Sequence, residues 1–255
     1  MLEICAIASG SNGNCYYIGN SEASILIDAG ISRKQIFMRF EQTNLNINNI
    51  KAIFISHEHC DHYCGVRVLS KKIGVPVYMT EKTLKNGWKH HRPSNVLFFN
   101  PGDIVPIGDF SVHTFFKNHD ATEPCSFRVE YKGINVGVFT DIGIACDNVI
   151  NHLSQCQAIF LESNYDEKML WSGSYPSYIK ERIASKYGHL SNEQAMKLLE
   201  EHHNPKLQLV LLSHLSEENN RPEIAMQTFE RLKSKFDIQL TNRYSAGEVF
   251  SIKCT

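Results

Sequence analysis

The chain has 255 residues, of which 42% are hydrophobic and 21% charged, and its formal net charge is -1. This composition argues against disorder and provides for a sizeable core. The length favours one domain over residues 1–255 rather than two small ones. A net charge near zero gives no global electrostatic case for a nucleic-acid partner, although a local basic patch is enough for such binding.

The N-terminal residues and the cysteines indicate in which cellular compartment the protein is expected. The first residues, MLEICAIASGSNGN, contain neither a basic region nor a long apolar run, so no signal peptide is visible. No apolar run approaches membrane-spanning length, and none of the eight cysteines forms a CxxC pair. We therefore expect a cytoplasmic protein without membrane association, whose thiols are reduced and mostly buried.

Short apolar runs rich in β-branched and aromatic residues predict strands from end to end. The main ones lie at residues 2–8, 24–30, 51–56, 110–116, 134–141, 158–162 and 207–213. Helical patterns lie among them, at residues 32–44, 64–74, 176–186, 191–203 and 221–235. This order predicts two sheets with helices outside, a layered α/β sandwich.

Two local signals refine this prediction. CSFRVEY and INVGVFT, joined at Lys132 and Gly133, are typical of a hairpin. Ser191 with Gln194 three residues later predicts a capping box at the start of a helix.

Several predicted strands end in a polar residue: Asp28, Ser56, Asp141, Glu162 and Ser213. Repeated placement of polar groups directly after apolar strands gathers them at one rim of the sheets. Active sites usually lie at such a rim, so we expect the site there.

The stretch HEHCDH, residues 57–62, follows one of these strands. Two imidazoles separated by one residue, His57 and His59, can converge on one ion. Asp61 and His62 can turn toward a second ion nearby. Imidazole and carboxylate ligands together suit zinc, manganese or iron, so the stretch predicts a metal site rather than polar surface.

Cys60 lies inside this stretch and Cys64 shortly after it. Thiolate ligation of a zinc ion by either cysteine is disfavoured, because the sequence contains no CxxC pair to complete such a site. We expect both cysteines to be small buried side chains beneath the site.

HxHxDH after a strand resembles the signature of the metallo-β-lactamase superfamily. The resemblance implies an αββα four-layer sandwich, two mixed sheets with helices outside. It also implies two divalent ions, zinc or manganese with iron as a further option. One ion would be held by His57, His59 and His119, the other by Asp61, His62 and His214, with Asp141 bridging them.

Each later residue also has a simpler interpretation. His119 in KNHDAT, taken alone, fits a loop histidine, Asp141 in FTDIG a helix cap, and His214 in LLSHLS the end of a strand. Their order after the first motif favours ligation. Asp28 in LIDAG is expected to support a ligand histidine rather than to bind metal itself.

Glu162 in LESN, His189 in GHLSN and His214 in SHLS resemble, in that order, the phosphodiesterase branches of the superfamily. These branches include the tRNA 3′-processing endonucleases and the β-CASP nucleases. No β-CASP insertion separates Glu162 from His189, and no Gly/Pro-rich tRNA-binding arm is visible. The likeness is to the stand-alone WalJ/YycJ group, which includes 5′→3′ DNA exonucleases. Its motifs here are ASGSNGN, ILIDAGIS, SHEHCDH, TDIG, LESNYDEKML, YPSYIKERI, GHLSN and HLSEENN.

Two divalent ions can lower the pKa of a shared water, so we predict attack on a phosphodiester by a metal-bridging hydroxide, with Asp61 orienting it and available to accept its proton. His189, oriented by Glu162, is the candidate general acid for the leaving oxygen. The simpler interpretation of His189 is that it only precedes the helix at 191–203.

Candidate substrate contacts are six polar residues in turn-rich segments: Ser9, Asn12, Asn14, Asn164, Asn219 and Asn220. Plain turn formation explains them about as well. The densest basic stretch, residues 82–92, contains Trp88 and offers a path for DNA. A solvated face with a core tryptophan is the commoner arrangement and is what we expect there.

The favoured function is a dinuclear-metal phosphodiesterase that acts on DNA as a 5′→3′ exonuclease. Three alternatives stay open. The first is a hydrolase of small substrates, such as a cyclic phosphodiester, thioester or lactone. The second is an RNA-processing nuclease similar to RNase Z. The third is a non-catalytic protein that binds nucleic acid or a partner and uses its metals to fold. Nothing in the sequence indicates an obligate protein partner.

Overall fold

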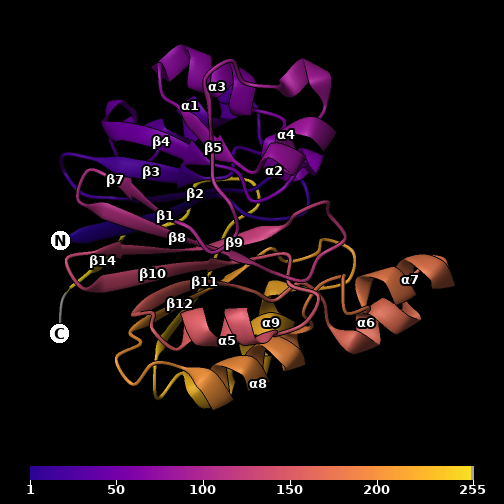
Figure 1. Cartoon of the computed structure of the whole chain (residues 1–255). Coiled ribbons are helices and arrows are strands. Elements are labelled where there is room, and N and C mark those ends of the chain that lie inside the picture. The colour runs from indigo at the N-terminus through magenta and orange to yellow at the C-terminus, as the bar shows by residue number, and fades with distance from the viewer. Residues whose placement is uncertain (254–255) are drawn as a thin grey trace.

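The computed structural model describes residues 1–253. Two sheets of seven strands each stack face to face, and helices cover their outer faces (Figure 1). The first sheet has the order β14-β1-β2-β3-β4-β5-β6 and the second the order β13-β12-β11-β10-β9-β8-β7. Both sheets are mixed, because each joins antiparallel pairs to a parallel run. The sandwich predicted from the sequence is confirmed.

The strand bounds follow the predicted apolar runs. In the first sheet they are β1 (Leu2–Ala8), β2 (Cys15–Gly19), β3 (Ser24–Ile27), β4 (Ile50–Phe54), β5 (Val77–Met79), β6 (Val96–Phe98) and β14 (Phe250–Ile252). In the second sheet they are β7 (Ile104–Ile107), β8 (Phe110–Phe116), β9 (Cys125–Tyr131), β10 (Ile134–Phe139), β11 (Ala158–Glu162), β12 (Leu209–Ser213) and β13 (Asp237–Leu240).

The helices divide between the two halves of the chain. Those of the first half are α1 (Arg33–Glu41), α2 (Cys60–Tyr63), α3 (Val66–Ile73) and α4 (Glu81–Asn86). Those of the second half are α5 (Asp147–Leu153), α6 (Glu167–Ser172), α7 (Ser177–Ile183), α8 (Asn192–His202) and α9 (Pro222–Thr228). Short 3-10 turns lie at Ile47–Asn49, Lys89–His91 and Glu230–Leu232. Within the described residues, every helix is too short or too polar to span a bilayer.

Both local predictions are confirmed. β9 and β10 pair antiparallel, and the turn between them puts Lys132 at φ 50° and Gly133 at φ 82°, the left-handed pair that a tight hairpin requires. The Ser191 hydroxyl accepts from the N–H of Gln194, and the Gln194 side chain accepts from the N–H of Ser191, so the capping box starts α8.

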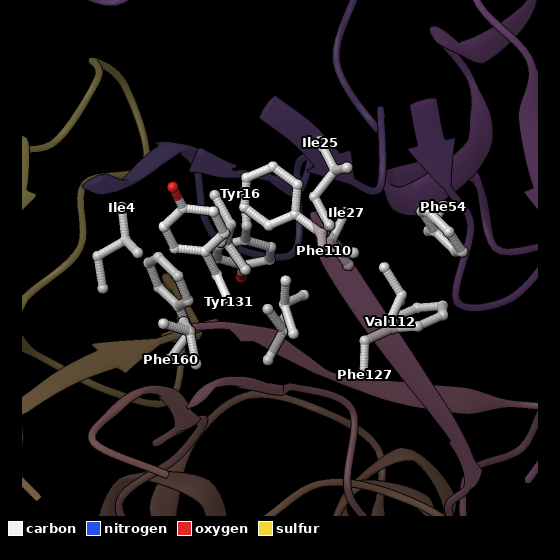
Figure 2. Packing of buried hydrophobic residues seen from close by; sticks show 14 of the residues in the cluster. Ile4, Tyr16, Ile25, Ile27, Phe54, Phe110, Val112, Phe127, Tyr131 and Phe160 are labelled. Carbon is white, nitrogen blue, oxygen red and sulfur yellow. The ribbon is translucent and has the colours of Figure 1, made fainter. Parts of the chain in front are cut away.

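Aromatic side chains from both sheets meet in the central core (Figure 2). The ring centroids of Phe54 on β4 and Phe127 on β9 lie 5.7 Å apart, and those of Tyr16 on β2 and Phe160 on β11 lie 4.9 Å apart. All four side chains are buried. This packing fixes the sheets relative to one another and brings the ends of β4 and β11 to the same rim.

Several elements end earlier than predicted. The runs 24–30 and 134–141 stop being strands at Ile27 and Phe139, because Asp28 and Asp141 adopt left-handed backbone angles of φ 63° and 56°. The helix predicted at 221–235 ends at Thr228, and a 3-10 turn follows.

The expectation for Cys60 and Cys64 is wrong. The two residues lie one helical turn apart, with Cα atoms separated by 5.0 Å, and form a disulfide. Cys60 is exposed rather than buried, because α2 buries His62 and Tyr63 and leaves Cys60 on its outer side. Free thiols are found as predicted at four buried positions, Cys5, Cys15, Cys125 and Cys156, and at half-buried Cys146. Cys254 lies outside the described residues.

The expectation of a core tryptophan at 88 is also wrong, because Trp88 is 63% exposed at the start of a 3-10 turn. That turn lies on the surface of the first half of the chain, where Arg67 of α3 donates to the carbonyl of His90.

Candidate metal centre

The predicted ligands gather at one rim of the sandwich. Each stands in a loop that follows a strand of one of the two sheets or, for Asp61 and His62, in α2, which follows such a loop. They form overlapping groups whose ligand atoms lie within 4.8 Å of one another. The residues in these groups are His57, His59, Asp61, His62, His119, Asp141, Glu162, His189 and His214.

A first set consists of three imidazoles. His57 Nε2 lies 3.0 Å and His119 Nε2 3.3 Å from Nδ1 of His59. Burial lowers the pKa of His57 well below its ordinary value and that of His119 to about 3, so both rings are neutral. Neutral imidazoles are the form that binds a metal.

A second set combines a carboxylate with two imidazoles. Asp61 Oδ2 lies 3.4 Å from His62 Nε2 and 3.6 Å from His214 Nε2. Burial alone raises the pKa of Asp61, but the adjacent His62 and His214 outweigh it and hold the pKa below its usual range. The group is therefore a carboxylate at neutral pH.

Asp141 lies between the two sets. Its Oδ2 is 3.2 Å from His62 Nε2, and its Oδ1 is 3.8 Å from His119 Nε2. One carboxylate thus reaches both groups of imidazoles, which is the arrangement that a bridging ligand needs.

Two buried atoms of this cluster show that its residues fit a metal. Among the described residues, Asp141 Oδ2 and His214 Nε2 have no hydrogen-bond partner. Buried polar atoms are costly when they are left unpaired, and a cation between them would satisfy both. Their nitrogen and oxygen donors are those that divalent zinc, manganese and iron accept. The cluster therefore suits a divalent metal.

Hydrogen bonds fix the orientation of the imidazoles on the side of the first sheet. Asp28 Oδ2 lies 2.7 Å from His62 Nδ1 and 2.9 Å from the Ser56 hydroxyl. The same hydroxyl lies 2.9 Å from His57 Nδ1. These contacts leave the Nε2 atoms of both rings facing the cluster. This is the geometry expected of Asp28 as a support for a ligand histidine.

Glu162 has the same role on the side of the second sheet. Its Oε1 lies 2.9 Å from both His189 Nδ1 and His214 Nδ1. Its carboxylate also accepts from the backbone N–H groups of Asp141, Ile142 and Leu190. Burial raises the pKa of Glu162, but His189 and His214 lower it to about 2, so the group is ionised.

At His214, the neighbouring acids outweigh the effect of burial on the pKa. Burial lowers the pKa of this imidazole, yet Asp141, Asp61 and Glu162 raise it to about 10. Without a metal, protons therefore offset the negative charge of the acids. A metal that binds here has to displace such a proton, so its affinity falls as the pH falls.

Sequence reasoning missed Lys117. Its side chain is 1% exposed, and its ammonium donates to the carbonyl of Thr140 at 2.7 Å and lies 4.0 Å from Asp141 Oδ2. A lysine two residues before His119, at the end of β8, was the available signal. Its burial depends on the packing of the loop after β10 against the loop after β8, a contact between distant parts of the sequence.

Five of the six candidate substrate contacts are buried. The Ser9 hydroxyl accepts from the N–H of His214, and the Asn164 amide donates to the carbonyl of His214. Asn14 lies 3.1 Å from His62 Nε2 through its amide nitrogen. The Asn219 N–H donates to the Ser216 hydroxyl within its own loop, and the Asn220 amide donates to the carbonyl of Ser163. Only Asn12 of the six is exposed, so substrate contact stays a prediction chiefly for Asn12.

The fold and cluster together match a known family. The model of the metallo-beta-lactamase superfamily matches residues 8–214, and the chain belongs to this superfamily of metal-dependent hydrolases. It is 35% identical to exodeoxyribonuclease YycJ of Bacillus anthracis, covering 100% of this chain and 95% of that protein. It is 33% identical to exodeoxyribonuclease WalJ of Streptococcus pneumoniae, covering 91% and 88%. The resemblance noted in the sequence is confirmed.

Solved structures show the same fold at low identity. The metallo-beta-lactamase fold protein YhfI of Bacillus subtilis superimposes with a TM-score of 0.73 at 16% identity, over 96% of this chain and 98% of that one. The short form of human tRNase Z superimposes with a TM-score of 0.67 at 15% identity, over 99% and 100%. These likenesses establish the αββα architecture alone.

Replacing Glu162 by Gln tests the carboxylate's structural role. An amide offers one acceptor oxygen where several donors converge, so we expect the free energy of unfolding to fall by about 1–3 kcal/mol at pH 7. The pKa of Glu162 is lowered from 4.5 to about 2, so the stabilisation is complete above pH 4.5 and is lost as the pH falls toward 2. Urea denaturation of chelator-treated wild type and Glu162→Gln from pH 7 to pH 3 measures this difference. Glu193→Gln, at an exposed position of α8, is the control. A difference in unfolding free energy that stays constant with pH would contradict the assignment.

Proposed function

We propose that this hydrolase is a dinuclear-metal phosphodiesterase that degrades DNA from its 5′ end. The observation that carries the proposal is the Glu162 carboxylate, which bonds both His214 in the buried cluster and His189 at its edge. A partly exposed imidazole beside such a centre is what cleavage of a phosphodiester requires. The identity of 35% and 33% to proteins named exodeoxyribonucleases supports DNA as the substrate.

The proposed ligands follow the two sets described above. His57, His59 and His119 would hold one ion, Asp61, His62 and His214 the other, and Asp141 would contact both. Zinc and manganese both fit these donors. Bound divalent ions lower the pKa of water and offset the negative charge that builds up on a phosphodiester during displacement.

The proposed role of Asp61 is to orient the attacking group and accept its proton. Its side chain is 24% exposed, whereas His62 and Asp141 beside it are buried. The carboxylate therefore contacts the buried cluster and is also partly accessible to solvent. Because it is ionised, it is an acceptor that orients the nucleophile.

The proposed role of His189 is to protonate the leaving oxygen. Its Nδ1 donates to Glu162, so the Nε2 is free to face the substrate, and the side chain is 19% exposed. The hydrogen bond to the Glu162 carboxylate holds the ring in this orientation. Glu162 thus positions the general acid without touching substrate itself.

A cleavage assay on linear duplex DNA tests the proposed activity and its direction. One sample carries a label at the 5′ end and another at the 3′ end, and protein stripped of metal is reloaded with manganese or zinc. We expect early release of mononucleotide from the 5′ label, and none with Asp61→Ala. Intact DNA with both metals would overturn the DNA assignment. The next substrates would then be precursor tRNA and cyclic phosphodiesters, which test the RNase Z-like and small-substrate alternatives.

His189→Ala tests the general acid separately from metal binding. We expect kcat on DNA to fall by about 10²–10⁴ while the bound metal content stays at the wild-type value. A substrate with a better leaving group, such as a nitrophenyl phosphodiester, should lose far less, because its leaving oxygen needs no proton. An equal loss on both substrates, or unchanged turnover of DNA, would remove His189 from this role.

A further inference from the structure

The segment from residue 166 to residue 188, here called the arm, leaves β11 after Glu162 and returns at His189. Its helices α6 and α7 project at the edge of the molecule, away from the helices that cover the second sheet (Figure 1). α7 has no buried residue, and α6 buries only Leu170. Helices of this length are unstable by themselves in water, so a helical pair with so little burial is well suited to gain contacts from a partner.

The base of the arm is attached to the metal centre. The carbonyl of Gly188 accepts from His119 Nδ1 at 3.0 Å, and the carbonyl of Tyr187 accepts from the N–H of Asp120 at 3.0 Å. Arg182 of α7 forms an ion pair with Asp120. The arm therefore starts and ends within a few residues of Glu162 and His189, and it is fixed to the loop of a proposed ligand.

Three large aromatic side chains of the arm face solvent. Trp171 is 52% exposed, Tyr178 69% and Tyr187 49%. Lys186 places its ammonium 5.2 Å from the ring centroid of Tyr187, and Lys168 on α6 has no ion-pair partner among the described residues. Exposed rings beside cations are the combination that holds a single nucleic-acid strand, because bases stack on the rings and phosphates meet the cations.

We propose that the arm holds the single-stranded end of DNA next to the metal centre, with bases stacked on Trp171, Tyr178 and Tyr187. This inference rests on the proposed function and adds how the enzyme recognises its substrate. Stacking accepts any base, which suits an exonuclease that must pass through every sequence. Tyr187 lies two residues before His189, and its carbonyl accepts from the N–H of Asp120, so this end of the arm is attached beside the proposed metal centre.

The basic stretch at residues 82–92, with its own exposed Trp88, is the competing surface. It lies in the first half of the chain, and its tryptophan is 63% exposed. The chain thus contains two tryptophans, one on each candidate surface, and each is a matched control for the other.

Tryptophan fluorescence and fluorescence anisotropy test the proposal. Metal-loaded Trp88→Phe protein, with Trp171 as its one tryptophan, is titrated with a 5′-phosphorylated, phosphorothioate-linked oligodeoxynucleotide, and a gel confirms that the strand stays intact. We expect saturable quenching of Trp171. In anisotropy measurements on otherwise wild-type protein, Trp171→Ala should raise Kd roughly tenfold, since a stacked base contributes about 1–3 kcal/mol. Trp171→Phe should recover most of the affinity.

Other outcomes overturn the inference. Binding by Trp171→Ala within twofold of wild type would do so, as would a larger loss in Trp88→Ala. A change of oligomeric state in Trp171→Ala at unchanged Kd would show that the arm contacts a second copy instead. Quenching and the Kd shift do not depend on turnover. Binding through the arm without cleavage would therefore count against the exonuclease function alone, and cleavage without involvement of the arm would count against this inference alone.

Discussion

The carboxylate of Glu162 is the group on which the rest of the site depends. It is fully buried at the end of β11, and five groups donate hydrogen bonds to it. Burial raises its pKa, but His189 and His214 lower it, so the group is ionised. Those donors come from the loop after β10, the segment before α8 and the loop after β12. A buried carboxylate without these donors would be very costly, so the burial of Glu162 holds three separate loops in one arrangement. The spacing between the proposed metal ligands and the proposed general acid follows from that arrangement.

Backbone strain is concentrated at the same rim. Asp28, Asp141 and His214 each follow a strand and adopt a left-handed backbone, at φ 63°, 56° and 57°. Residues with a Cβ rarely adopt this region, and the packing of the two sheets must hold them there. In return, the chain turns sharply at each strand end and directs the side chain into the cluster. Strain retained in three members of one polar cluster indicates that the geometry serves function rather than stability.

The sequence was sufficient to predict what depends on local pattern. The apolar runs predicted the strands that build the sandwich, and HEHCDH with His119, Asp141 and His214 predicted the residues that the fold brings together. Asp28 was expected to support a histidine, and its contact with His62 agrees.

What the sequence did not predict depends on contacts between distant segments or on which way a side chain points. The burial of Lys117 requires the loop after β10 to cover it, and the burial of Asn164 and Asn220 requires neighbouring loops to accept their hydrogen bonds. The Cys60–Cys64 disulfide forms because both side chains lie on the outer side of the same helical turn. The helical pattern at residues 176–186 was visible, but nothing local revealed that α7 would bury no residue.

The central claim is that the rim holds two ions in two separable sets of ligands. Elemental analysis after equilibrium dialysis against limiting zinc or manganese tests it most directly, with wild type compared to His59→Ala. His59 belongs to the first set alone, so we predict two ions per chain in wild type and about one in the variant. One ion in the wild type, or the loss of all metal from His59→Ala, would contradict the two-site account.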